Sequence, residues 1–498
     1  MQPLDTRTLL SSGRALPLPA VLQWQSDSGT SETLEVLSVF RVLPEKRIVA
    51  LANWNGQLVV AKLFFVRGRW AQHLERETQG IATIMAADIA TPRLLATGVS
   101  TDDGTGVLLL QYIDNSVSVG QRWQNAAEPE RDLLLHKVVA LIAECHNKGL
   151  LQKDIHLDNF LMRGDDLYLL DAAAIERQSV EADGVGVDSV RSLQNLALFL
   201  AQFPVSNDTS VQSLHAFYRA RRPEADISAD TGMFAALLRQ NRLARLKVVL
   251  AKLYRETSAH ICVRQWDKFV VYRREMDSAA MREFIADPDS AIAEGRLLKK
   301  GNSSTVALIR IAGRHYVLKR YNIKNVWHGL SRLLRPSRAW VSWRNAHMLE
   351  MLGIATPTPL LMMERRLGML RREAYFLCDH VPGEDALHLL GKEPINSPAW
   401  SRALEQFDAL FQIMCDYGIV HGDMKATNFI SNETALVVLD LDAMRQEQDG
   451  RRFVMAFRKD LQRFAANWQN QPELAQGVAS LIARIDRTLE QDSRNNTL

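Results

Sequence analysis

The chain has 498 residues, which is too long for one hydrophobic core and suits two domains of roughly 200–250 residues. Its 47% hydrophobic and 23% charged residues are typical of a soluble globular protein, and a net charge of +3 is too small to argue for nucleic acid binding. Its four cysteines lie far apart, which argues against a disulfide framework or a zinc site and fits a reducing compartment.

The sequence has no recognisable targeting or membrane-spanning segment. The residues after Met1 lack the basic stretch followed by an apolar stretch that marks a signal peptide. No apolar run approaches the roughly 18–20 residues that cross a bilayer. We therefore expect a cytoplasmic protein that touches a membrane surface without crossing it.

The first half of the chain opens with predicted strands. Apolar runs, the last two joined by Asn55-Gly56 as a hairpin turn, predict the strands Leu37–Leu43, Ile48–Leu51 and Gln57–Phe65. A helix over Trp70–Ala86 and a buried strand over Val107–Ile113 are predicted next. A further helix, Leu133–Cys145, places five apolar residues on one face.

The second half repeats this order. Two strands joined by Ala312-Gly313 and a helix are predicted, at Thr305–Ile311, His315–Tyr321 and Ala339–Leu352. A strand and an amphipathic helix follow, at Ala374–Cys378 and Trp400–Met414. We expect a first domain over residues 1–255, a linker over 256–294 and a second domain over 295–498.

The predicted helices Leu133–Cys145 and Trp400–Met414 each lead into the same polar signature. The copies are Asp154, Asn159 and Asp171, and Asp423, Asn428 and Asp440. A single offset of 269 residues superposes all three positions, and Thr91-Pro92 matches Thr356-Pro357 at an offset of 265. Such agreement favours a duplication over two chance motifs.

This signature is what phosphoryl transfer from Mg-ATP requires. A first Asp orients or deprotonates the acceptor hydroxyl, and an Asn and a second Asp hold Mg²⁺ on the phosphates. Asp154 and Asp423 are therefore the candidate catalytic residues. The candidate Mg²⁺ ligands are Asn159, Asp171, Asn428 and Asp440.

A kinase also needs a strand lysine that binds phosphate and a helix glutamate that orients it. Lys62 and Lys319 each follow a hairpin turn in an apolar strand, and the bland alternative is a solvated strand lysine. Glu77 is the predicted partner of Lys62, with Glu75 as a competitor. In the second half the matching position is Ser342, which cannot form an ion pair.

Other nucleotide-binding candidates differ between the halves. Lys300 and Gly301 begin a run of small residues that could approach phosphate, whereas the first half has no glycine loop. Lys425 can reach the γ-phosphate, and His156 is its weaker counterpart. His421 supports the second loop where the first has Gln152.

Two further features leave alternatives open. Asp442 is either an additional metal ligand or a cap. The basic and aromatic segment 319–344 is either a solvated helix and loop or a patch for an anionic glycolipid or membrane surface. Neither half has room for the long activation segment on which a protein kinase docks a peptide, so a small-molecule or glycan hydroxyl is the expected acceptor.

At these residues the chain resembles the lipopolysaccharide kinase family, the Kdo, heptose and InaA-like kinases of Gram-negative bacteria. The resemblance is carried by Leu297–Gly301, Tyr316–Asn322, Ser342–Ala346 and His421–Phe429, and in the first half by Val39–Leu43 and Lys153–Phe160. It implies ATP with Mg²⁺ as cofactors and a sugar hydroxyl of the lipopolysaccharide core, linked to lipid A at the inner-membrane surface, as acceptor.

The expected fold is α+β: two tandem protein-kinase-like bilobal domains, each with an antiparallel β N-lobe and a mainly helical C-lobe. The leading function is an ATP-dependent kinase of heptose or Kdo in the inner core, with no nucleic acid partner. Alternatives are a small-molecule kinase of the aminoglycoside or choline type and a pseudokinase regulator with one or both halves inactive.

Overall fold

The computed structural model contains two compact units. The first comprises Met1–Gln202 and Asp208–Asn241, and the second comprises Phe203–Asn207 and Arg242–Leu498. The structure describes residues 2–13, 15–178, 186–223, 231–322, 336–368, 370–431 and 435–495. Among these residues, every helix is too short or too polar to serve as a transmembrane span.

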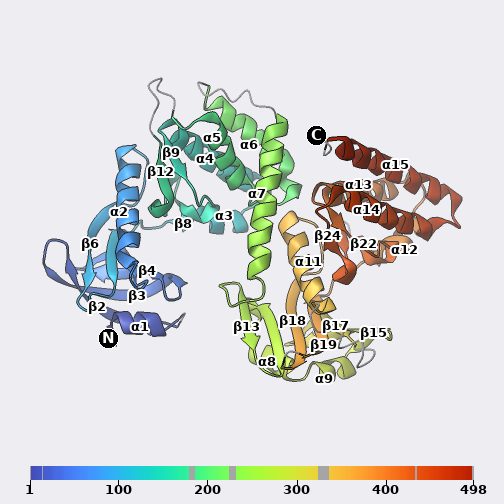
Figure 1. Ribbon diagram of the computed structural model, residues 1–498, viewed down its shortest axis with the longest axis horizontal. Helices are drawn as coiled ribbons and strands as arrows, with labels where there is room; N and C mark the ends of the chain where they lie inside the picture. Colours follow the sequence, from blue (N-terminus) through green and yellow to red (C-terminus); the bar gives the residue numbers. More distant parts are fainter. Residues whose placement is uncertain are drawn as a thin grey trace. The chain divides into compact units, whose positions relative to one another are not determined.

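The first unit begins with an antiparallel-rich sheet and ends with helices (Figure 1). Its sheet strands are β1 (Gln2–Leu4), β2 (Ala20–Ser26), β3 (Ser31–Leu43), β4 (Arg47–Trp54), β5 (Gln57–Phe64), β6 (Leu94–Ser100) and β7 (Gly106–Gln111). They run in the order β1-β2-β3-β4-β5-β7-β6, and β2 also pairs with β6.

Helices and short strands complete the first unit. The helices are α1 (Thr6–Ser11), α2 (Trp70–Ala86), α3 (Val119–Asn125), α4 (Glu128–Asn147), α5 (Ser189–Leu200), α6 (Asp208–Ala220) and the part of α7 (Thr231–Lys252) up to Asn241. The short strands are β8 (Val117–Ser118), β9 (Leu150–Gln152), β10 (Phe160–Arg163), β11 (Asp166–Leu169) and β12 (Ile175–Arg177). Three 3₁₀ turns lie at η1 (Leu157–Asn159), η2 (Ala172–Ala174) and η3 (Val205–Asn207), the last in the second unit.

The second unit follows the same plan of sheet and then helices (Figure 1). Its sheet strands are β13 (His260–Arg264), β14 (Lys268–Arg273), β15 (Arg296–Lys300), β16 (Ser304–Ile311), β17 (Arg314–Tyr321), β18 (Pro359–Leu367) and β19 (Leu370–Asp379). Their order is β13-β14-β18-β19-β17-β16-β15. The central order β15-β16-β17-β19-β18 repeats β3-β4-β5-β7-β6 of the first unit.

The remaining elements of the second unit also correspond in order to those of the first. The helices are α8 (Ala279–Ala286), α9 (Pro288–Glu294), α11 (Arg338–Leu352), α12 (Ala386–Lys392), α13 (Pro398–Asp416), α14 (Gly450–Ala465) and α15 (Pro472–Asn495). The short strands are β20 (Glu384–Asp385), β21 (Ile419–Val420), β22 (Phe429–Ser431), β23 (Leu436–Val438) and β24 (Arg445–Gln446). The 3₁₀ turns are η4 (Arg274–Met276), η5 (Ala426–Asn428), η6 (Leu441–Ala443) and η7 (Ala466–Trp468).

Local sequence chemistry explains the central hairpins. Asn55 and Gly56 have φ of 52° and 82°, and Trp54 pairs with Gln57 across them. Ala312 and Gly313 adopt φ of 48° and 84° between Ile311 and Arg314. Both residues of such a two-residue turn are left-handed, a conformation that glycine reaches without steric cost.

The α+β prediction is confirmed, because antiparallel sheets precede mainly helical regions. The apolar faces predicted for α4 and α13 are also buried, with Val138, Phe407 and Phe411 fully inaccessible. Phe407 packs edge-on against Phe429, whose ring lies 5.2 Å away and which directly follows Asn428. The core helix thus anchors the loop that carries the second signature.

The segment 256–294, expected to be a linker, is folded. It supplies β13 and β14, and β14 pairs with β18 from Lys268↔Arg365 to Tyr272↔Leu361. The boundary between the compact units falls at Asn241 and Arg242, within α7. The sequence did not indicate these strands because their apolar runs, Ile261–Val263 and Phe269–Tyr272, are short and are bounded by polar or charged residues.

Candidate active site

In each unit, hydrogen bonds join the signature residues into one local structure. The Asn428 amide donates to the Asp423 carbonyl at 2.8 Å, and the Asn428 carbonyl accepts from Leu439 N at 2.8 Å. In the first unit the Asn159 amide donates to the Asp154 carbonyl at 2.5 Å. In the second unit Asn428 therefore ties the loop of the first Asp, through its side chain, to the strand before the second Asp, through its backbone carbonyl.

The second Asp of each copy has the same unusual backbone conformation. Asp171 has φ of 57° and ψ of 62°, and Asp440 has φ of 55° and ψ of 57°. Both begin a 3₁₀ turn, and left-handed backbone at a residue other than glycine is uncommon. The turn is thus a shared structural feature of the two units.

The residue two positions before the first Asp links the loop to the same turn. His421 Nε2 contacts the Leu439 carbonyl at 3.0 Å, and Asp423 N donates to His421 Nδ1 at 3.4 Å. Gln152 makes the matching contacts, donating to the Asp171 carbonyl at 2.8 Å and accepting from Asp154 N at 3.3 Å. Burial lowers the pKa of His421, so its neutral form makes these contacts at neutral pH.

In the first unit, the predicted lysine and glutamate lie together. Lys62 Nζ contacts Glu77 Oε1, and both side chains are buried. Glu77 Oε1 also accepts from Ala172 N at 3.2 Å, which attaches α2 to the turn after Asp171. Glu75 instead bonds to Gln79 on the helix surface.

The second unit orients its lysine differently. Lys319 Nζ contacts Asp440 Oδ1 and lies 2.8 Å from Asp442 Oδ2. Arg338 Nη2 is also 2.8 Å from Asp442 Oδ2, and the Asp442 side chain is only 5% exposed. Burial alone would lower the pKa of Lys319, but Tyr321 and the two carboxylates raise it well above its ordinary value.

The helix of the second unit makes no acidic contact with this lysine. Ser342 is buried, and its Oγ lies 2.9 Å from the Tyr321 hydroxyl. Glu350 pairs with Arg273 at 2.7 Å. Asp442, which the sequence left open as a metal ligand or a cap, is therefore a partner of Lys319 and Arg338.

The two first Asp residues differ in their surroundings. The Asp423 carboxylate has Lys425 Nζ at 3.2 Å and Arg463 Nη1 at 3.0 Å. Asp154 is exposed and forms no side-chain ion pair with any described residue, and His156 does not reach it as Lys425 reaches Asp423. Lys425 of the second loop and Arg463 of α14 thus bring two cations to Asp423.

The predicted phosphate-binding loops also differ. Lys300 ends β15 and Gly301 follows it, where Gly301 N donates to the Ser304 carbonyl at 3.0 Å and closes a tight turn. In the first unit Arg47 starts β4 and lies 3.6 Å from Asp171 Oδ2. This cation beside the second Asp was not predicted, because sequence spacing does not show which side chain faces the turn.

The basic segment 319–344 is only partly described, since residues 323–335 lie outside the described residues. Of its described cations, Lys319 and Arg338 bind carboxylates of the site, and Arg320 lies 3.0 Å from Asp289. These three side chains are engaged within the unit, which leaves them no role in a freely exposed patch.

The oxygen donors of each unit fit a magnesium ion. Among the described residues no three His, Cys, Asp or Glu side chains gather into a metal site. One Asn amide and one Asp carboxylate per unit nevertheless suit Mg²⁺, which is usually held by one or two protein oxygens, phosphate oxygens and water. Despite burial, which raises it, the pKa of Asp440 is lowered by Lys319, so its carboxylate is ionised at neutral pH.

Part of the chain is similar to a known protein family, and some solved structures resemble it weakly. A search of curated proteins gives no match. Among matching solved structures is a rhoptry kinase from Toxoplasma gondii, at 12% sequence identity and a TM-score of 0.28. The match covers 35% of this chain and 57% of that chain, and it is too weak to bear on function.

The family comparison concerns the second unit. The sequence model described as "Lipopolysaccharide kinase (Kdo/WaaP) family" matches residues 282–483, which include β15 to β24 and the second signature. This match confirms the family resemblance for that part of the chain. Residues 282–483 thus match the lipopolysaccharide kinase (Kdo/WaaP) family, which supports a kinase, a phosphotransferase that uses ATP and usually Mg²⁺.

Proposed function

We propose that the second unit is an ATP-dependent kinase that phosphorylates a sugar hydroxyl, of heptose or Kdo, in the lipopolysaccharide inner core. One observation carries this proposal. Within the region that matches the family, Lys319 contacts Asp440, and Asn428 ties that strand to the Asp423 loop. A phosphate-binding cation, two metal-binding oxygens and a base are the parts that phosphoryl transfer requires.

Each side chain has a proposed role. Asp423 accepts a hydrogen bond, and then the proton, from the acceptor hydroxyl. Lys425 and Arg463, both within 3.2 Å of that carboxylate, add positive charge near the transferred group. Lys319 binds the phosphates that do not transfer, and Asp442 and Arg338 fix its position.

Asn428 and Asp440 are the proposed ligands of the metal. Mg²⁺, when bound, neutralises the charge that develops on the phosphate oxygens. Asp440 contacts Lys319, which brings the proposed metal ligand and the proposed phosphate-binding cation together at one site. The acceptor is lipid-linked under this proposal, so the enzyme would work at the cytoplasmic face of the inner membrane.

For the first unit we propose a kinase-like domain of the same plan whose activity is weaker or absent. Lys62 and Glu77 support nucleotide binding, and Asp154, Asn159 and Asp171 would serve as base and metal ligands. Asp154 forms no ion pair with any described residue, whereas Asp423 contacts Lys425 and Arg463, and this difference favours the regulatory alternative for the first unit.

The decisive experiment is Mg-ATP turnover on defined core oligosaccharides that end in Kdo or heptose. We expect Asp423→Ala to reduce kcat by at least about a hundredfold, the usual contribution of a positioned base. Asp154→Ala should leave most of the turnover intact. Asp408→Asn, which removes a surface carboxylate paired with Arg484, is the matched control.

Two results would contradict the proposal. Turnover that survives Asp423→Ala but not Asp154→Ala would assign the chemistry to the first unit. Unchanged core phosphate in a clean deletion strain would remove lipopolysaccharide as the acceptor and favour a small-molecule kinase.

A further inference from the structure

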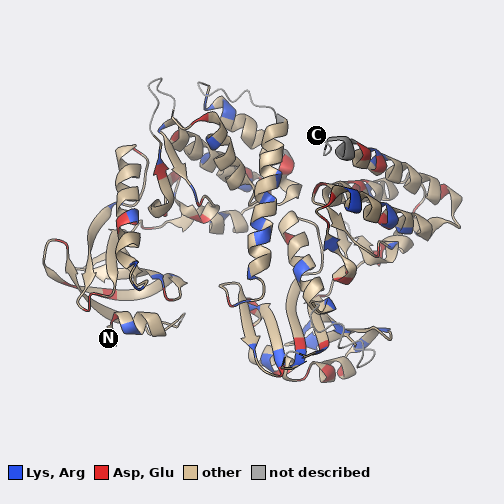
Figure 2. Cartoon of the chain, viewed as in Figure 1, with Lys and Arg blue, Asp and Glu red and all other residues tan. Residues whose placement is uncertain are grey.

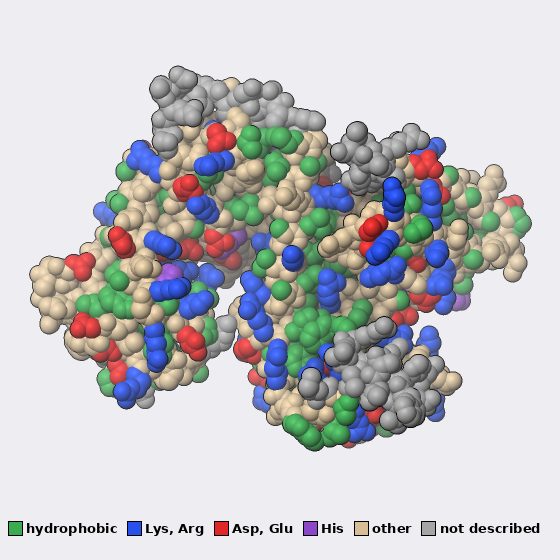
Figure 3. All heavy atoms as spheres, viewed as in Figure 1, with side chains coloured by type: hydrophobic (Ala, Val, Ile, Leu, Met, Phe, Trp, Pro, Cys, Tyr) green, Lys and Arg blue, Asp and Glu red, His purple; other side chains and the backbone are tan. Residues whose placement is uncertain are grey.

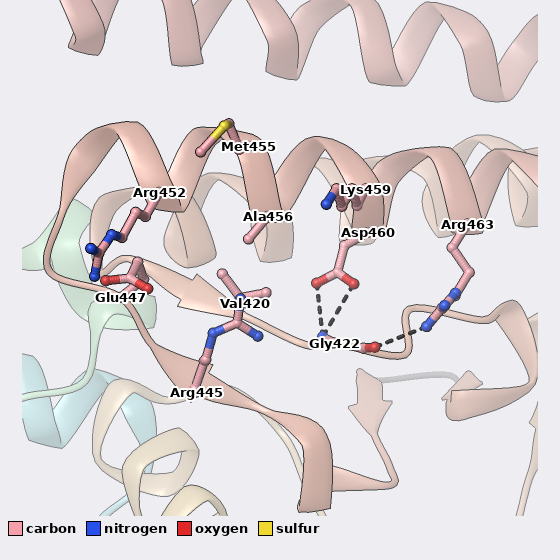
Figure 4. Close-up of a pocket in the computed structure, with 10 residues that line it drawn as sticks. All are labelled: Val420, Gly422, Arg445, Glu447, Arg452, Met455, Ala456, Lys459, Asp460 and Arg463. Carbon is pink, nitrogen blue, oxygen red and sulfur yellow. Dashed lines mark hydrogen bonds between the residues drawn. The ribbon is translucent and has the colours of Figure 1, made fainter.

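A basic pocket lies beside the proposed catalytic loop of the second unit. Its volume is about 400 Å³, and its walls come from β21, β24 and α14 (Figure 4). Arg445 projects into it from β24, and Arg452, Lys459 and Arg463 line it from α14. Figure 2 shows the basic bands along α14, and in Figure 3 basic side chains gather over this helix.

Three of these cations have no counter-charge among the residues that the structure describes. The side chains of Arg445, Arg452 and Lys459 form no ion pair or hydrogen bond with any described residue. The pocket has two carboxylates of its own, but Asp460 accepts from Gly422 N at 3.1 and 2.9 Å. Glu447 is the other, so positive charge is in excess, and a concave wall concentrates its field.

The fourth cation connects the pocket with the proposed base. Arg463 Nη1 donates to the Gly422 carbonyl at 2.8 Å and to Asp423 Oδ1 at 3.0 Å. One guanidinium therefore borders the pocket and touches the carboxylate that would hold the acceptor hydroxyl. A group bound in the pocket lies within one side chain of the reacting end of the acceptor.

The fold does not require these charges. In the first unit the equivalent strands have the same register, with Glu176↔Leu151 where the second unit has Arg445↔Val420. Glu176 lies 2.5 Å from Lys153 and 4.0 Å from Arg191, so the charges there are paired. At this position the first unit thus carries a paired acid where the second unit carries an unpaired cation.

The segment that contributes β24 and α14 has no side chain that phosphorylation could convert into an anion. Residues 435–479, which include β24, α14 and the segment between them, contain no Ser, Thr or Tyr. A phosphorylated side chain of this segment therefore cannot neutralise the pocket. We therefore take a bound molecule as the source of the anion.

We propose that this pocket binds a phosphate or carboxylate group of the acceptor while the reacting hydroxyl lies at Asp423. The inference rests on the proposed function and adds the residues that hold the anionic group of its substrate. Guanidinium groups match the planar or tetrahedral oxygens of carboxylate and phosphate, and the nearness of Arg463 to Asp423 lets one molecule occupy both places.

The test uses the full chain and a double variant, Arg452→Ala with Lys459→Ala, which removes two exposed cations outside the proposed catalytic machinery. Turnover and calorimetric binding are measured with matched core oligosaccharides that carry a phosphate, a carboxylate or neither. Arg451→Ala, on the same helix but outside the pocket, is the control. Arg445→Glu, which copies the first unit, is a second variant.

In the double variant we expect the KM for both anionic acceptors to rise about tenfold or more, because binding common to the ground and transition states is lost. The value of kcat, the KM for ATP and the KM for the neutral acceptor should not change. The ratio of the phosphate and carboxylate effects identifies the preferred anion. Equal changes in KM for anionic and neutral acceptors, or no change in either, would overturn the inference. Turnover by the wild type in the same experiment would still uphold the proposed function. No turnover by the wild type on any acceptor would overturn the function itself. Inorganic phosphate that binds with equal affinity to wild type and variant would separately exclude the pocket as an anion site.

Discussion

Lys319 and Asp442 are in direct contact, with Nζ 2.8 Å from Oδ2, although the helix position that holds Glu77 in the first unit is Ser342 in the second. The strand lysine has therefore kept a carboxylate partner in both units while the element that supplies it has changed. Helix α2 supplies it in the first, and the 3₁₀ turn after β23 supplies it in the second.

Replacing Asp442 with Asn should weaken ATP binding by the second unit. Lys319 and Arg338 would lose the carboxylate that fixes both, and we expect about a tenfold higher dissociation constant, equivalent to about 1.4 kcal/mol. Calorimetric titration of ATP measures it, with Asp408→Asn as the control. A folded Asp442→Asn protein with wild-type affinity would show that the contact does not position the lysine.

His421→Gln should be tolerated, whereas His421→Ala should not. A glutamine at the equivalent position of the first unit already donates to a carbonyl of the turn and accepts from the loop amide. The alanine variant leaves buried polar groups unpaired, which costs about 1–3 kcal/mol. Urea unfolding and turnover of the two variants test this, and equal loss in both would contradict it.

Gly80→Ala should lower the free energy of unfolding of the first unit. A Cβ at Gly80 would lie 2.0 Å from the Ala172 carbonyl oxygen, in the turn after Asp171. Forcing apart packed backbone costs roughly 1–3 kcal/mol. Gly391→Ala is the control, because nothing lies within 4 Å of that site and alanine favours its helix. Urea unfolding compares the two, and an equal stability for both variants would refute the close approach.

Acid should destabilise the first unit through His146. Burial lowers its pKa from 6.5 to about 3, while its ring contacts Tyr218 and Asn195. In this case the unfolded chain binds the proton first, so stability is full above pH 6.5 and falls as the pH drops below it. Between pH 7 and pH 5 the loss from one such residue is about 2 kcal/mol.

Hydrogen exchange of α4 at pH 7 and pH 5 measures this loss locally. His146→Gln removes the titrating ring and should flatten the difference in protection between the two pH values, even where it lowers protection at both. An undiminished difference would assign the acid sensitivity to other buried histidines, such as His215, whose pKa is also lowered.

The recurring parts of the site could be predicted from sequence because they are close together in the chain. Asp423, Asn428 and Asp440 lie within one loop and the following hairpin, so their spacing alone brings them together. Lys62 and Glu77 were predictable for a similar reason, since a strand leads directly into the helix that packs against it. Their catalytic roles remain predictions.

Other parts depend on tertiary contacts. Asp442 was ambiguous because only the folded turn shows that its side chain is buried against Lys319 and Arg338. The cations of the basic pocket come from β24 and from successive turns of α14, so no short motif contains them. The strand β14 was missed because its position is set by pairing with β18, about ninety residues later in the chain.

Among the described strands of the second unit, β15 lies at one edge of the sheet and has a neighbour on one side only. Such an edge offers free backbone groups to any incoming strand. Here Arg296, Lys299 and Lys300 are exposed along it, beside the half-exposed Leu297 and Leu298. Two molecules that met edge to edge would oppose these like charges, so the same residues that lead into the glycine turn also guard the protein against self-association.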